Sequence, residues 1–170
     1  MKLVDFLHGK WLGHPLHSAI VHIPVGAWIA ACGLDVANWL GWNGPAPARL
    51  ALYCVSAGLL VAFAAVPTGI VDWLPIKPGK PARRLGWYHM ALNAAAIVTW
   101  AVNLTWRIHQ DGEVTLRILT SSIVGALLVF ISGYIGSLMV FDQGTAVARE
   151  SKHEWKEIAR RAGSRVPEEK

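Results

Sequence analysis

The sequence is poor in charge, because only 16% of its 170 residues are Asp, Glu, Lys or Arg. Soluble domains typically carry about 25% charged residues. Hydrophobic residues make up 54% of the chain, so the composition excludes an ordinary soluble domain and favours a membrane protein. The formal net charge of +5 does not indicate a nucleic-acid partner. The basic residues lie between and after apolar segments, where they act as topology signals and lipid-headgroup contacts.

Cysteine is also scarce. Cys32 and Cys54 both fall inside apolar segments without CxxC spacing, so we expect buried structural thiols and no disulfide or zinc framework. The sequence has no hydrolase elbow, phosphate-binding loop or HExxH zinc motif, which argues against a standalone enzyme. The residues before the first apolar segment are too polar for a cleavable signal peptide.

What the chain does contain is a set of long apolar segments, which predict an all-α, integral membrane four-helix transmembrane bundle. The expected spans cover about residues 15–41, 48–74, 86–107 and 117–141. An amphipathic lead-in over residues 1–13 precedes the transmembrane domain (14–147), and a basic tail over 148–170 follows it. The tryptophans are interpreted as aromatic belts at the two membrane interfaces.

Two prolines fall within these spans and predict local irregularities. Pro24 is expected to kink the first span or free a carbonyl, and Pro67 with Gly69 is expected to interrupt the second span near its end.

The distribution of lysine and arginine predicts that both termini are cytoplasmic. The lead-in, the loop 75–85 and the tail hold thirteen of the sixteen, and the opposite side holds only Arg49, Arg107 and Arg117. An excess of these residues marks the cytoplasmic side of a membrane protein. We therefore expect a multi-pass membrane protein with this orientation.

Polar residues inside the predicted spans indicate a site. His14, His17 and His22 open the first span, although imidazoles are unusual in a hydrocarbon-spanning helix. In the predicted topology, Asp72 ends the second span and His89 begins the third, so all five side chains lie in the cytoplasmic leaflet. The sequence therefore predicts a polar site on that side of the bundle.

One chemistry that uses such residues is b-type haem, held by one imidazole from each of two facing helices. His89 would provide one ligand, with His22 as the preferred ligand opposite it and His17 as the alternative. Arg83 or Arg84 would then reach the propionates at the surface.

The second chemistry is a transition-metal site for an ion such as Zn, Cu or Fe. Its ligands would be three or four of His14, His17, His22 and His89, with Asp72 as a further ligand or as an orienting group. A proton path through histidine and aspartate is a third use, which needs no cofactor.

Structural functions are the alternative for each of these residues. The histidines would then contact headgroups or cap helices, and Asp72 would pair with Arg83 or Arg84. His8, in the lead-in, is interpreted as a surface residue. Asp35, deep in the first span, is expected to make a structural bond to Asn103 or to another polar group.

Several motifs over about residues 12–147 resemble those of a family of small bacterial membrane proteins, the domain of unknown function 2231 family. The motifs are Leu12-Gly-His-Pro-Leu-His-Ser-Ala-Ile-Val-His-Ile-Pro-Val-Gly26, Leu34-Asp35, Pro67-Thr-Gly-Ile-Val-Asp-Trp73, His89-x-x-Leu-Asn93 and Gly133-Tyr-Ile-Gly136. The resemblance implies a four-helix transmembrane domain in the bacterial inner membrane, sometimes found beside redox modules such as Rieske or cytochrome domains. It implies no established activity.

These observations lead to two functional hypotheses. The first is an electron-transfer subunit that binds b-type haem or a transition metal through cytoplasmic-side histidines and works with a redox partner. The second is a cofactor-free accessory or assembly subunit of a larger membrane complex. A small-ion or proton transporter is the third hypothesis. It ranks after the other two because the spans show no evident inverted repeat.

Overall fold

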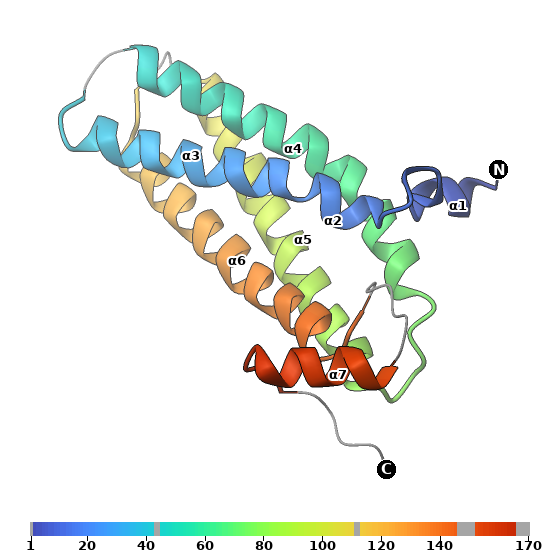
Figure 1. The fold of residues 1–170 in the computed structure, drawn as a ribbon. Helices are drawn as coiled ribbons and strands as arrows, with labels where there is room; N and C mark the ends of the chain where they lie inside the picture. The colour runs from blue at the N-terminus through green and yellow to red at the C-terminus, as the bar shows by residue number, and fades with distance from the viewer. Residues whose placement is uncertain (1, 43–44, 111–112, 146–151, 166–170) are drawn as a thin grey trace.

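The computed structural model describes residues 2–42, 45–110, 113–145 and 152–165, and these residues contain helices and turns but no strand (Figure 1). The helices are α1 (Leu3–Leu7), the 3-10 turn η1 (Lys10–Leu12), α2 (Leu16–Ile20), α3 (His22–Trp39), α4 (Pro45–Trp73), α5 (Pro81–Ile108), α6 (Leu116–Phe141) and α7 (Lys152–Arg161). The prediction of an all-α protein is confirmed.

The long helices form two closely packed antiparallel pairs, α3 with α4 and α5 with α6 (Figure 1). The pairs are joined mainly by the packing of α3 on α6 and of α4 on α5. A helix hydrogen-bonds its own backbone N–H and C=O groups, so a chain this apolar can enter lipid without exposing unpaired backbone.

Three helical segments are long and apolar enough to cross a membrane: Leu16–Trp39, Pro45–Trp73 and Leu116–Phe141. Helix α5 has a comparable length of 28 residues, but it carries His89, Asn93, Asn103 and other polar groups along its length. A fourth crossing and the orientation of the termini therefore stay predictions.

The two internal prolines have different effects. Pro24 has no N–H to donate toward the carbonyl of Ile20, and the first apolar segment is divided at Val21 into α2 and α3. Helix α4 instead continues through Pro67 to Trp73, so the predicted interruption there is wrong. Packing of neighbouring helices lets a long apolar helix tolerate the loss of one backbone bond.

Tryptophan side chains build the centre of the bundle. The rings of Trp28 (α3) and Trp100 (α5) stack with their centroids 5.7 Å apart, and both are buried. Gly58 and Gly125 provide the space, because a Cβ at either position would lie within 2.7 Å of an indole ring. The interpretation of the tryptophans as interface belts is therefore wrong for these two residues.

The segment before α2 folds back toward α4. Gly9 makes this turn with a φ of 77°, and a Cβ there would lie 2.2 Å from the carbonyl oxygen of His14, so only glycine fits. Lys10 forms an ion pair with Asp5 and holds the pKa of that carboxyl below its ordinary value. The turn brings His8 to the end of α4.

Candidate functional site

His17 and His89 approach each other between the two helix pairs. His17 comes from the short helix α2 and His89 from the start of α5, and the two rings lie 6.4 Å apart between centroids with their planes at 83°. Both side chains are half-buried. We call this part of the bundle the histidine end.

His17 is held by α4 through one ring nitrogen. Its Nδ1 lies 3.2 Å from the carbonyl oxygen of Ala65 and 3.1 Å from Oγ1 of Thr68. The Thr68 hydroxyl donates its own proton to the Ala65 carbonyl at 2.6 Å. Both neighbours of Nδ1 are therefore acceptors, which places the ring proton on Nδ1 and leaves the Nε2 lone pair without a partner among the described residues.

His89 is held by α6 in the same manner. Its Nδ1 lies 2.9 Å from the carbonyl oxygen of Ser132 and 3.0 Å from the Ser132 hydroxyl. Asn93, one turn further along α5, donates to the Ser132 hydroxyl at 2.7 Å and to the His89 carbonyl at 2.9 Å. This arrangement again places the proton on Nδ1, and no described residue bonds to Nε2.

Glycines lie directly against both rings. A Cβ at Gly69 would be 2.7 Å from Cε1 of His17, and one at Gly136 would be 3.2 Å from Cε1 of His89. Side chains at these positions would displace the imidazoles, so the glycines permit the observed ring positions.

At the end of α4, Nδ1 of His8 lies 2.9 Å from Oδ1 of Asp72. The interpretation of His8 as a surface residue is therefore wrong, and Asp72 pairs with His8 instead of with Arg83 or Arg84, the partners considered in the structural alternative. The error arose because the turn at Gly9, which folds the lead-in back onto α4, leaves no periodic signal in the sequence.

The other predicted site residues lie apart from the imidazole rings of His17 and His89, which we call the ring pair. His14 and His22 are exposed, so the structure does not support the preference for His22 as the ligand opposite His89. Arg83 donates to the carbonyl oxygens of Trp73, Leu74 and Ile76 at 3.3, 3.0 and 2.9 Å, so its guanidinium closes the end of α4. Arg84 is exposed.

The predicted metal site is not assembled. Among the described residues, no three His, Cys, Asp or Glu side chains lie close enough together to hold a metal ion. The predicted set of His14, His17, His22, His89 and Asp72 is therefore divided into a ring pair, an ion pair with His8, and two exposed histidines. A metal bound only by protein side chains typically needs three or four of them.

A second polar cluster lies at the opposite end of the bundle, which we call the ionic end. Arg107 forms an ion pair with Asp35, and Asn103, Ser121 and Ser122 surround it. The expected structural bond of Asp35 is present, but its main partner is Arg107. The sequence prediction places Arg107 at the end of the third span and counts it among the cations of the opposite membrane side, but α5 extends to Ile108 and buries it.

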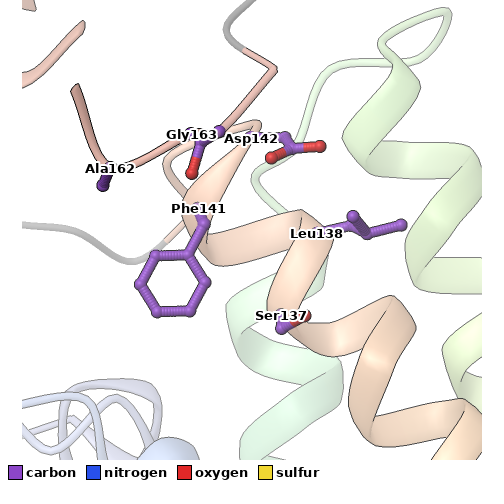
Figure 2. Close-up of a pocket in the computed structure, with 7 residues that line it drawn as sticks. Ser137, Leu138, Phe141, Asp142, Ala162 and Gly163 are labelled. Carbon is purple, nitrogen blue, oxygen red and sulfur yellow. The ribbon is translucent and has the colours of Figure 1, made fainter. Parts of the chain in front are cut away.

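The structure also has a shallow cavity of about 340 Å³ between the end of α6 and the residues that follow α7 (Figure 2). Leu138, Phe141 and Asp142 line it from one side, and Ala162 and Gly163 from the other. None of the histidines lines this cavity.

A family model described as "Predicted membrane protein (DUF2231)" matches residues 13–149. The chain belongs to this family. The match spans every residue of the histidine and ionic ends except His8, and it confirms the resemblance drawn from the sequence motifs. No curated protein and no solved structure matches the chain. The DUF2231 description supports a membrane protein, and functional inference depends on the geometry.

Sequence reasoning identified His17 and His89 but overlooked the residues that hold them. Thr68, Asn93 and Ser132 fix the two rings, and the first two stand within the DUF2231 motifs around Pro67 and His89. Polar residues one helical turn from an intramembrane histidine are the signal that points to them.

Proposed function

We propose that this protein is a membrane electron-transfer subunit that binds b-type haem between His17 and His89. The observation that carries the proposal is the ring pair, in which each imidazole is fixed through Nδ1 and keeps Nε2 for a ligand. Axial histidines in haem and metal sites are held in this way by a second-shell acceptor.

The distance between the rings supports this ligand. Two imidazoles on opposite sides of one metal ion, each with a metal–nitrogen distance of about 2 Å, hold their ring centres roughly 6–6.5 Å apart. His17 and His89 are separated by 6.4 Å. Haem also requires only two ligands from the protein, so it suits a site where, in the part of the chain that the structure describes, no third His, Cys, Asp or Glu joins the pair.

The chain's own residues would then have separate roles. Thr68 and Ser132 hold the imidazole protons and thereby orient Nε2 of each ring, and Gly69 and Gly136 leave room for the ring edges. Arg84 is the exposed cation for a propionate at this end, since Arg83 is bonded to backbone carbonyls. Bound haem would supply one-electron chemistry for a redox partner.

The test is the absorption spectrum of the detergent-purified protein, with a haem assay on the same sample. We expect a Soret band that His17→Ala and His89→Ala each abolish. His22→Ala is the matched control, because His22 lies in the same sequence motif but is exposed, and it should keep the band. Purified protein without a Soret band after expression in a haem-replete host would refute the proposal.

The angle between the rings provides a sharper test. Axial imidazoles with nearly perpendicular planes give ferric haem a highly anisotropic low-spin electron paramagnetic resonance signal. With the rings at 83°, we expect this signal and not the rhombic signal of parallel rings. Haem with a rhombic signal would show that a different pair of ligands holds it.

A cofactor-free accessory subunit is the second candidate, because the same polar bonds also join helices. His17 ties α2 to α4, His89 ties α5 to α6, and His8 ties α1 to Asp72 of α4. If His17→Ala and His89→Ala impair only the assembly of a larger complex, with no chromophore in the wild type, this function replaces the first.

We further infer four crossings of a bacterial inner membrane with both termini in the cytoplasm. Arg107 is buried against Asp35 and no longer counts as a topology cation, which leaves Arg49 and Arg117 opposite the thirteen basic residues of the other side. The test uses a variant without Cys32 and Cys54 that carries Lys77→Cys or His109→Cys. An impermeant thiol reagent should label position 109, but not position 77, from outside intact spheroplasts.

A further inference from the structure

The ionic end is closed off from solvent. Asp35 and Asn103 are fully buried, and the Arg107 side chain is only 4% exposed. Arg107 donates through Nη2 to Oδ2 of Asp35 and to the Ser122 hydroxyl, and through Nε to Oδ1 of Asn103 at 2.6 Å. Ser122 in turn donates to Oδ2 of Asp35 at 2.6 Å.

Asn103 extends this network to α6. Its amide nitrogen donates to the carbonyl oxygen of Ile118 at 3.0 Å and lies within 2.9 Å of the hydroxyls of Ser121 and Ser122. The cluster therefore connects α3, α5 and α6, and almost every polar atom in it has a partner.

One atom is the exception. Oδ1 of Asp35 is completely buried and accepts no hydrogen bond from the described residues. A buried carboxylate oxygen without a donor is costly, so native structures normally provide one, from protein or from ordered water.

The charge of the cluster limits what can fill this position. Asp35 and Arg107 neutralise each other, so neither a cation nor an anion would gain net attraction there. Oδ1 needs a hydrogen-bond donor. A water molecule is a neutral ligand that supplies one.

We propose that the ionic end holds a buried water molecule that donates to Oδ1 of Asp35. The water completes the bonds of the ion pair and makes this end of the membrane bundle a hydrated internal site. The proposal is independent of haem at the histidine end.

The experiment is X-ray radiolytic footprinting of the full chain in nanodiscs, read by mass spectrometry. Hydroxyl radicals formed from a bound water label adjacent side chains that bulk solvent does not reach. Ile118 and Val55 are both fully buried aliphatic residues, but Ile118 adjoins the cluster and Val55 belongs to the apolar core. We expect oxidation of Ile118 to exceed that of Val55 by about tenfold.

The double variant Asp35→Leu with Arg107→Met removes the polar atoms while keeping similar volumes. It should lower oxidation of Ile118 to the level of Val55. Equal oxidation of the two residues in the wild type would overturn the proposal, and so would undiminished oxidation of Ile118 in a folded double variant. If the double variant does not fold, the wild-type comparison alone decides.

Discussion

The two ends of the bundle use polar side chains in opposite ways. At the histidine end, His17 and His89 are half-buried, and each commits one ring nitrogen to the protein and keeps the other. At the ionic end, Asp35 and Arg107 are buried and bonded mainly to each other and to their neighbours. A polar residue within a membrane helix can therefore keep one atom available to a ligand, or it can bond mainly to other residues of the protein.

The small residues next to the two polar clusters also differ. At the histidine end, Gly69 and Gly136 lie against the imidazoles, in addition to the hydrogen-bonding side chains of Thr68 and Ser132. At the ionic end, Ser121 and Ser122 supply donors and acceptors, and no glycine is in close contact with the ion pair among the described residues. The hydrogen bonds of the ionic end connect three helices, α3, α5 and α6.

The largest effect is expected from breaking the ion pair. Arg107→Met leaves the Asp35 carboxylate buried without its cation and should lower the free energy of unfolding by about 3–5 kcal/mol. Unfolding in SDS titrations of the detergent-solubilised protein measures this. The double variant Asp35→Leu with Arg107→Met strands no charge, and we expect it to unfold within about 1 kcal/mol of the wild type. If Arg107→Met were as stable as the double variant, burial of Asp35 without its cation would carry no cost. The ionic end would then not depend on its ion pair.

Two buried serines of α6 allow a matched comparison. Ser122→Ala removes a hydrogen bond to a carboxylate and should cost about 1.5–3 kcal/mol, whereas Ser132→Ala removes neutral partners of His89 and Asn93 and should cost about 1 kcal/mol. The same SDS titration compares them. Ser132→Ala should also shift the reduction potential of a haem bound by His89, which Ser122→Ala should leave unchanged. A larger loss of unfolding free energy in Ser132→Ala than in Ser122→Ala would contradict the expectation that the polar bonds of the ionic end contribute more to stability than those of the histidine end.

The smallest effect is expected at the glycines. Gly69→Ala presses on the His17 ring and gains helix propensity, so its net cost should be about 1 kcal/mol. Gly133→Ala is the control, because its Cβ would meet nothing within 4 Å, and it should be neutral or slightly stabilising. Any haem at the histidine end should be bound less firmly in Gly69→Ala alone. Equal haem retention in the two variants would contradict the close fit at His17.

Much of the fold followed from the sequence, because apolar segments long enough to span a bilayer have few alternatives to helices. The first predicted span, 15–41, corresponds to α2 and α3 together, and the segment 117–141 corresponds closely to α6. The continuous α4 was not foreseen at Pro67, since the effect of a proline depends on the neighbours that pack around it.

The candidate site was predictable only in part. The preferred haem ligands were His89 and His22, with His17 as the alternative, but it is His17 that lies beside His89. The distinction between His17 and His22 depends on rotation about the helix axis and on the break at Val21, which Pro24 produces. The pairing of His8 with Asp72 and of Arg107 with Asp35 joins residues 64 and 72 positions apart, beyond any local pattern.

The sequence by itself determined that this chain is helical, apolar and built for a membrane, because hydropathy and helix length are properties of contiguous residues. Only the tertiary structure decided which polar groups meet, which nitrogens stay unpaired and which charges are buried. Those outcomes depend on how four long helices rotate and pack against one another, and small residues such as Gly58 and Gly125 set that packing from positions far apart in the chain.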